Sequence, residues 1–238
     1  MVSRPLDQKI SRALKPNRSQ IVQLGEPLPR FARSRLLPLS PAHLRARAVS
    51  ARGWGVIAGA DFFTTEVWTW RGLVTYYTVF VIDVASRRVQ ILGSTPFPNE
   101  AFMHQVSRTL TAADDGVLVG HRVLICDRDA KWSTALRDRL DEAGIRVVQT
   151  PLQAPNANAY AERFVRSIKY ECLNRIIPFG EHHLRRTIAE FVAHYHGERN
   201  HQGLANELIE RGGVEPRASR IRRRQRLGGL LNYYCRAA

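Results

Sequence analysis

Three segments with strong β-propensity follow one another between residues 55 and 95, joined by very short connections. Their sequences are GVIAGADFFTTEVW (55–68), VTYYTVFVIDV (74–84) and VQILGST (89–95). Branched and aromatic residues of this kind favour strands. Because parallel neighbours need a crossover of about a dozen residues or more, connections as short as RGL and ASRR predict an antiparallel meander.

Helical and β-prone segments alternate after the meander. In NEAFMHQVSRTLTAA (99–113), Phe102, Val106 and Leu110 recur at helical spacing. The next segments are predicted as a buried strand, a helix that stops at Gly144, a strand and two helices: HRVLIC (121–126), KWSTALRDRLDEAG (131–144), IRVVQTP (145–151), NANAYAERFVRSIKYE (156–171) and HHLRRTIAEFVAHYHGERN (182–200). This order predicts an α/β fold with a mixed five-stranded sheet flanked by helices.

Charge divides the chain into three parts, although the net formal charge is +15. Residues 1–50 hold ten Lys/Arg and two Asp/Glu, residues 211–238 hold eight and one, and residues 51–210 hold eighteen of each. We therefore expect a neutral core at 51–210, a poorly ordered basic arm at 1–50 and a basic tail at 211–238. Such arms commonly bind nucleic acid phosphates without reading sequence, or else serve only as a solubilising surface.

Membrane and disulfide-rich classes are disfavoured by the sequence. It contains no apolar run long enough to span a bilayer and no signal-peptide pattern at Met1, so we expect a cytoplasmic protein. Cys126, Cys172 and Cys235 are scattered without a CxxC pair. That spacing argues against a disulfide framework and against a cysteine zinc site.

Acidic residues at strand ends and helix starts are the candidates for chemistry on a nucleic acid. Two divalent metal ions about 3.5–4 Å apart can activate the attacking oxygen and stabilise the leaving oxygen of a phosphodiester. Hard ions such as Mg²⁺ prefer carboxylate oxygens. Rigid elements are therefore expected to bring such carboxylates together.

Asp61 lies inside the first predicted strand, on the same side as Ile57, Gly59 and Phe63. A carboxylate among apolar strand residues is costly unless a partner or a metal ion holds it, although an edge strand would also expose it to water. Asp83 is the rival at the end of the second strand. Because it immediately precedes a turn, we assign it a hydrogen-bonding role instead.

Asp127 ends the buried strand VLIC and opens the segment DRDAKW. Acids at the carboxyl ends of sheet strands are where α/β ligand sites tend to lie. Asp129, two residues further on, is placed to cap the following helix. We therefore assign the chemistry to Asp127 and the capping to Asp129.

Glu162 lies near the start of the helix at 156–171, which Asn156 or Asn158 could cap. One stripe of this helix is apolar: Ala161, Phe164, Val165, Ile168 and Cys172. On another side, Asn158, Glu162, Arg166 and Lys169 follow one another at helical spacing. By itself, the Glu162–Arg166 pair is equally compatible with an ordinary surface salt bridge.

Taken together, the three acids resemble the DDE signature of the retroviral-integrase superfamily, which includes bacterial insertion-sequence transposases. Four segments carry the resemblance: CDRDAKW (126–132), PNANAYAERFVRSIKYECLNR (155–175), FVAHYHGERNHQGL (191–204) and RLGGLLNYYCRAA (226–238). The first looks like the family's strand-end Asp segment, the second like its Glu helix, and the last two like transposase termini. The match covers about residues 55–210, with thirty-four residues between Asp127 and Glu162 (162 − 127 − 1).

The resemblance implies an RNase H-like fold in which Asp61, Asp127 and Glu162 hold two Mg²⁺ or Mn²⁺ ions. It further implies hydrolysis that frees 3′-hydroxyl DNA ends, followed by their transfer into a target. Arg166 and Lys169 match the family's donor-DNA contacts, and Asn158 and Arg163 of the same helix join them as candidates. The implied partners are element ends and target DNA, bound by a homo-oligomer that assembles on the DNA.

One departure from the family concerns residues 1–50, where transposases usually carry a helix-turn-helix region. No convincing helix-turn-helix or zinc module is visible there, which raises the expectation of a shortened or scrambled copy. His194, His196 and His201 lie close in sequence, and we interpret them as structural or phosphate-facing rather than as a metal cluster. Two alternatives stay open: a nuclease of the same fold that cuts without joining, and an inactive DNA-binding remnant.

Overall fold

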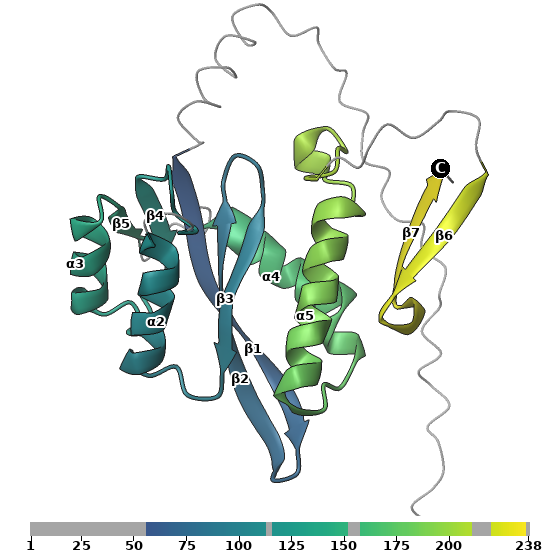
Figure 1. The fold of residues 1–238 in the computed structure, drawn as a ribbon, viewed down its shortest axis with the longest axis horizontal. Coiled ribbons are helices and arrows are strands. Elements are labelled where there is room, and N and C mark those ends of the chain that lie inside the picture. Colours follow the sequence, from purple (N-terminus) through teal and green to yellow (C-terminus); the bar gives the residue numbers. More distant parts are fainter. Residues whose placement is uncertain (1–55, 113–115, 152–157, 211–219, 237–238) are drawn as a thin grey trace, which may run out of the picture. The chain divides into compact units, whose positions relative to one another are not determined.

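The computed structural model describes residues 56–112, 116–151, 158–210 and 220–236 (Figure 1). All of them belong to one of the chain's two units, Pro41–Ala238. The expected basic arm at 1–50 lies outside the described residues, as does Asn156 at the entry to the predicted Glu162 helix.

A five-stranded sheet forms the centre of this unit, in the order β3-β2-β1-β4-β5. The strands are β1 (Ile57–Thr69), β2 (Gly72–Asp83), β3 (Val89–Thr95), β4 (Val123–Cys126) and β5 (Arg146–Gln149). The first three pair antiparallel, whereas β4 lies parallel to β1 and β5 parallel to β4. The predicted meander and the predicted mixed sheet are therefore confirmed.

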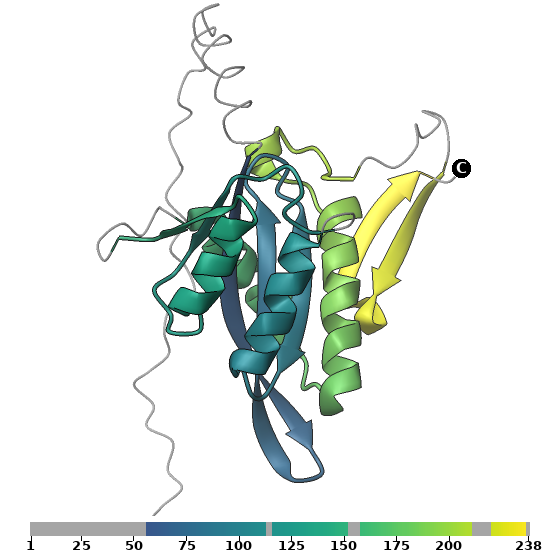
Figure 2. The ribbon, with the colours of Figure 1, turned by 60° about the vertical axis from the view of Figure 1, so that its left-hand side comes forward.

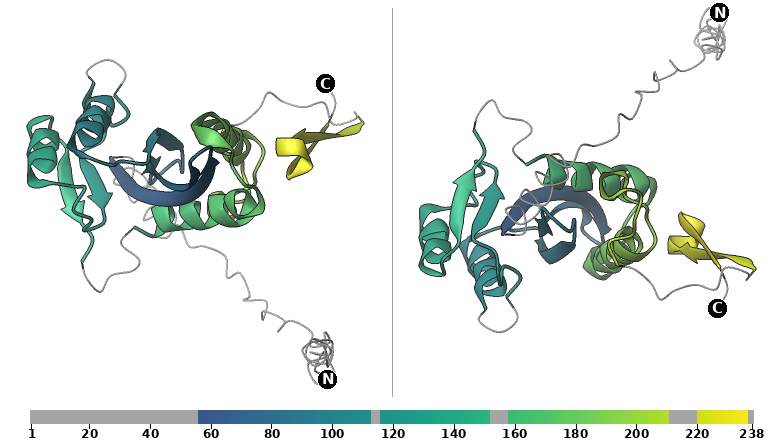
Figure 3. Two further views of the ribbon diagram at one scale, coloured as in Figure 1. Left: turned by 90° about the horizontal axis from the view of Figure 1, so that it is seen from below. Right: turned by 90° about the horizontal axis from the view of Figure 1, so that it is seen from above.

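Helices cover both faces of the sheet, as the two end views show (Figure 3). They are α2 (Glu100–Thr111), α3 (Thr134–Glu142), α4 (Ala159–Glu171) and α5 (Gly180–Gly197). The helices α2 and α3 lie on one face, and α4 and α5 on the other (Figure 2). Strand alternation produces this division, since neighbouring residues of a strand point to opposite faces.

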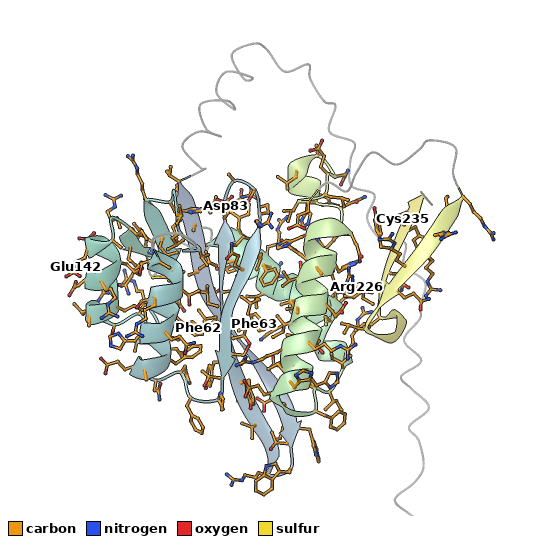
Figure 4. The ribbon with its side chains drawn as sticks, viewed as in Figure 1. Phe62, Phe63, Asp83, Glu142, Arg226 and Cys235 are labelled. Carbon is orange, nitrogen blue, oxygen red and sulfur yellow. The ribbon has the colours of Figure 1, made fainter. Side chains whose placement is uncertain are left out.

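The central strand β1 contributes to both cores. Phe63 packs in the core under α4 and α5, whereas Ala58 and Ala60 pack in the core under α2 and α3. Phe62 and Phe63, drawn in Figure 4, accordingly belong to opposite faces of the sheet. The face that carries Gly59, Phe63 and, between them, Asp61 is thus the face covered by α4.

Aromatic packing fixes α4 on the sheet. The ring of Phe164 lies 4.8 Å from that of Phe80 on β2 and 5.1 Å from that of Tyr195 on α5, measured between centroids. Phe164 is fully buried. Aromatic pairs of this kind contribute about 0.5–1.5 kcal/mol each beyond the area they bury, so the helix is held firmly beside β1.

The basic C-terminal segment contains a two-stranded sheet that the sequence analysis did not anticipate. Its strands are β6 (Ile221–Arg226) and β7 (Leu231–Arg236), joined through the short 3₁₀ segment η4 (Leu227–Gly229). Arg226, labelled in Figure 4, forms ion pairs with Glu190 of α5 and with Glu198, the residue that follows this helix. Leu231 is buried in the core under α4 and α5. The segment is therefore attached to α5 although its sequence, IRRRQR, is strongly charged.

The three cysteines are free thiols buried in the fold. Throughout the parts of the chain that the structure describes, no helix combines the length and the apolar character needed to cross a bilayer.

Candidate active site

Asp61 and Asp127 occupy corresponding positions on adjacent parallel strands. The last residue pair between β1 and β4 joins Gly59 to Ile125. Asp61 lies two residues after Gly59, and Asp127 lies two residues after Ile125. Because paired strands lie about 4.8 Å apart, this register places the two aspartates on adjacent strands, just beyond the end of the β1–β4 pairing. The Asp61 carboxylate also accepts a hydrogen bond from the Phe62 backbone N–H at 2.7 Å.

Helix α4 is anchored beside Asp61 through Asn158. The Asn158 side chain is buried, and its amide donates to the carbonyl oxygen of Ala60 at 3.1 Å. Its amide oxygen lies so close to Gly59 that a Cβ on that glycine would approach it to 2.6 Å. Asn158 therefore positions the helix, which is a different role from the DNA contact predicted for it.

Glu162 is the next residue on the anchored face, one turn after Asn158. Its backbone N–H donates to the Asn158 carbonyl at 3.1 Å, and its side chain is exposed. Within the described residues Glu162 forms no ion pair with Arg166, so the surface salt bridge considered from sequence is not formed. The Glu162 carboxylate is thus available at the edge where β1 and β4 bring their aspartates.

The charges of the other predicted carboxylates act on Asp61. Its pKa is raised to about 6, chiefly by burial; the hydrogen bond from Phe62 opposes this shift, and the charges of Asp127, Glu162 and Asp129 add to it. The pKa of Asp127 is also raised, first by burial and then by the charge of Asp129. Like charges gathered in this way repel one another, and a bound cation would relieve that repulsion.

No group of three or more His, Cys, Asp or Glu side chains within the described ranges is arranged so that it could hold a metal ion as it stands. The donor set nevertheless suits a hard cation, because it consists of carboxylate oxygens alone. Mg²⁺ in particular keeps several waters and is often bound by only one or two carboxylates together with substrate phosphates.

Asp129 does not cap the following helix, so that prediction is wrong. Its carboxylate accepts from the backbone N–H and the ammonium group of Lys131. The cap of α3 is instead Ser133, whose hydroxyl accepts from the Leu136 N–H. The cause is spacing, because α3 begins at Thr134 rather than directly after Asp129.

Lys131 is a cation beside the aspartates that sequence reasoning missed. Its ammonium group pairs with Asp129 and lies 5.1 Å from the ring centroid of Phe62. Its charge also lowers the pKa of Asp127, against the larger effect of burial. A lysine two residues from an acid in a loop carries no sequence signal of its own, because only the fold turns it toward the site.

The residues assigned structural roles behave as predicted. The Asp83 carboxylate accepts from the backbone and hydroxyl of Ser86, and its other oxygen lies 2.8 Å from His121 Nε2. His194 pairs with Glu198, His196 accepts from the Val89 N–H at 2.9 Å, and His201 donates to the Tyr195 carbonyl. All three histidines are buried, and each has a partner inside the fold.

The anchoring of α4 yields a prediction for Gly59→Ala. The new methyl group would displace the Asn158 amide and shift the start of α4, so we expect a loss of roughly 1–3 kcal/mol in unfolding free energy. Because Glu162 moves with the helix, any activity that depends on it should also fall. Gly197→Ala is the control, since a Cβ there meets nothing within 4 Å. Equal stability of the two variants in denaturant titrations would contradict the anchoring role.

The sequence comparison matches one part of the chain to a known family. Residues 143–207 match the integrase core domain family, a stretch that contains β5, α4, α5 and with them Glu162. The sheet order and the two helical layers are those of the RNase H-like fold of integrase catalytic cores. This part of the chain is therefore similar to the integrase core domain family.

A comparison with solved structures gives a match to one catalytic core domain. The catalytic core domain of BIV integrase matches this protein with a TM-score of 0.43 and 10% sequence identity, over 63% of this chain and 88% of that chain. None of the curated proteins matches it in sequence.

An integrase core domain supports a general function in polynucleotidyl transfer of the integration type. It implies a phosphoryl-transfer enzyme with DNA as its partner, and catalytic domains of this family generally use divalent metal ions.

Proposed function

We propose that this protein carries out DNA transposition or integration, with Asp61, Asp127 and Glu162 as its metal-binding and catalytic carboxylates. The observation that supports the proposal is the register of β1 and β4, which places Asp61 and Asp127 on adjacent strands. The charges of Asp127 and Glu162 both act on Asp61, so bringing these acids together would cost repulsion. Such a cost is typical of a site built for cations.

Two Mg²⁺ or Mn²⁺ ions would be held by these carboxylates, and when bound they supply activation of the attacking oxygen and stabilisation of the leaving oxygen. Asp61 and Asp127 would contribute from the sheet, where strand pairing fixes their backbones. Glu162 would contribute from the helix, where Asn158 fixes the first turn. Burial of Asp61 limits competing water, which strengthens its attraction to a cation.

The proposed chemistry consists of two phosphodiester exchanges. In the first, water attacks a phosphorus atom at an element end and forms a new P–O bond, while the bond from that phosphorus to the 3′-oxygen breaks. The released 3′-oxygen takes up a proton and leaves a DNA strand with a free 3′-hydroxyl. In the second, that hydroxyl attacks a phosphorus atom of the target and displaces the target strand's own 3′-oxygen. No covalent link between protein and DNA is needed, so the protein's task is to position the strands and to balance charge.

Two cations on α4 are proposed to position the donor strand. Arg166 and Lys169 follow Glu162 by one and two helical turns. Arg166 is exposed, and Lys169 lines a hollow beside β1 with Glu66 and Trp68. Phosphate contacts of this kind fix register without reading sequence.

We expect Arg166→Ala to impair end processing more than overall DNA affinity, because this side chain would position one phosphate rather than attract the whole duplex. We also propose that more than one copy of the protein assembles on the DNA.

The function is tested by Mg²⁺-dependent cleavage and joining of the DNA ends that flank the gene. We expect the full chain to cut these ends and to join them to a target. If the protein cuts the DNA ends but does not join pre-cut ends to a target, it is a nuclease of the same fold. DNA binding without either reaction would leave a noncatalytic remnant and contradict the proposal.

The basic C-terminal segment provides a separate prediction about DNA affinity. Deleting it would also remove Leu231 and Arg226 from their packing on α5, so substitution is the cleaner change. Converting the exposed Arg222, Arg223 and Arg224 to Gln should weaken DNA binding and flatten the dependence of log K on log salt. Each lost phosphate contact should lower the slope by roughly 0.9.

Salt titrations of DNA binding measure both quantities. Arg108→Gln, on the exposed side of α2, is the matched control for loss of a single positive charge. If the triple variant has the same slope as the wild type, the C-terminal arginines do not contact DNA.

A further inference from the structure

A small cavity on the flank of α4 is lined by arginines, of which only Arg163 is a DNA contact predicted from the sequence. It has a volume of about 230 Å³ and lies between α4, the end of α5, the 3₁₀ segment η3 (Gln202–Leu204) and the turn between β2 and β3. Three arginines line it, namely Arg87, Arg163 and Arg199. None of the described residues that line it is an aspartate or a glutamate. We call it the arginine cavity.

Arg87 is held in an unusual arrangement at this cavity. Its backbone adopts the left-handed region with φ 66°, which costs a non-glycine residue of order 1 kcal/mol. Its guanidinium carbon lies 3.3 Å from the centroid of the Tyr160 ring. Its Nη1 atom is buried without a hydrogen-bond partner among the described residues. A buried donor on a cation is costly to leave unpaired, so an anion is the partner that would satisfy it.

The other two arginines differ in how their charge is balanced. Arg199 donates to both carboxylate oxygens of Glu171, at 2.7 and 3.1 Å. This ion pair neutralises its charge and holds its side chain in place at the cavity. Arg163 is exposed on α4 and forms no ion pair within the described part of the chain. Arg87 interacts with Tyr160 but, like Arg163, forms no ion pair among the described residues, so both guanidinium groups face a cavity without acids.

The size and the lining of the cavity indicate the class of ligand. Sites for cofactor-sized molecules have volumes of about 300–1,000 Å³, and this cavity is smaller. Arginine guanidinium groups match phosphate oxygens with paired donors. The remaining wall contains the rings of Tyr160 and Tyr195 and the amides of Asn200 and Gln202, which suit the sugar or base attached to a phosphate.

The position of the cavity indicates the source of that phosphate. Arg163 directly follows Glu162, so the cavity and the carboxylate face are neighbouring flanks of one helix, about 100° apart. DNA bound at Glu162, Arg166 and Lys169 would pass beside the cavity. We propose that the arginine cavity binds a phosphate group of the DNA strand next to the reacting one, a proposal that rests on the proposed function.

The first test measures phosphate binding alone, with the full chain and without divalent metal. Inorganic phosphate should raise the thermal midpoint of the wild type above that in chloride of equal ionic strength. Arg163→Ala and Arg87→Gly should each weaken phosphate binding roughly tenfold or more, the effect of losing a charged hydrogen bond. Glycine accepts the φ of Arg87, so this variant should keep the fold.

The control is Arg108→Ala on α2, on the opposite side of the sheet. This variant should bind inorganic phosphate as the wild type does. Equal phosphate affinity in the wild type, Arg163→Ala and Arg87→Gly would overturn the proposal. Because this phosphate-binding test requires no cleavage, it decides the role of the arginine cavity even if the protein proves inactive.

The second test distinguishes DNA from a free phosphate compound. In salt titrations with a short duplex, Arg163→Ala and Arg87→Gly should each bind more weakly and lower the salt slope by roughly 0.9, whereas Arg108→Ala should not. If the two variants lose phosphate affinity but bind DNA like Arg108→Ala, the ligand is a free phosphate compound. That result would overturn the assignment to DNA.

Discussion

Asp127→Asn should abolish Mg²⁺-dependent cleavage and joining while leaving DNA binding nearly unchanged. The amide keeps the size of the side chain but removes the charge that holds a cation. Stabilisation of the reacting oxygens is worth several kcal/mol, so we expect a rate loss of about a thousandfold or more. DNA affinity rests mainly on Lys and Arg, and a gel-shift titration should therefore give a similar dissociation constant.

Two matched variants make this result specific. Asp138→Asn changes an exposed acid on α3 in the same way and should retain full activity. Asp129→Asn tests the neighbouring acid, whose carboxylate is already engaged by Lys131. If Asp129→Asn is inactive and Asp127→Asn is active, the two roles have been assigned to the wrong residues.

Asp61→Asn should have two opposite effects, a loss of activity as large as that of Asp127→Asn and a gain in stability at neutral pH. The native carboxyl has a pKa of about 6, raised from 3.8 by burial and then by neighbouring acids. Between these values the folded state binds more protons than the unfolded state, so stability falls as pH rises. Above pH 6 the carboxyl is ionised in both states, and the full loss of stability applies. Asp61→Asn should therefore raise the free energy of unfolding by roughly 2–3 kcal/mol.

Denaturant titrations at several pH values, without divalent metal, measure the stability effect. The gain of Asp61→Asn over the wild type should be large at pH 7 and small near pH 4, where both carboxyls are protonated. Added Mg²⁺ should then stabilise the wild type more than the variant, because ligand binding to the folded state raises stability. A variant less stable than the wild type at pH 7 would contradict the electrostatic account of the site.

Most of the sheet could be predicted because its signals are local. Strand alternation in 55–95 and the short connections fix an antiparallel meander, and Gly144 ends α3 with φ 79° as a helix-terminating glycine should. The proximity of Asp61 and Asp127 also follows from position, since both lie two residues beyond a parallel strand pair. These features depend on neighbours in the chain or on strand register.

Other features could not be predicted because they depend on contacts between distant residues. Asn158 has the pattern of a helix cap, yet its side chain bonds to Ala60, ninety-eight positions away. The residues of the arginine cavity, such as Arg87 and Arg199, are separated by more than a hundred positions. The sequence of β6 predicts a solvated run of arginines. Its attachment to the fold depends on the ion pairs of Arg226 with Glu190 and Glu198.

Strand transfer from pre-cut ends tests the central claim most directly. Duplexes that carry the flanking end sequences with a free 3′-hydroxyl are incubated with the full chain, a plasmid target and Mg²⁺, and joined products are counted by sequencing. The wild type should produce joined molecules, and Asp61→Asn, Asp127→Asn and Glu162→Gln should produce none. Joining that persists in any one of these variants, or that proceeds equally well after chelation of the metal, would contradict the account.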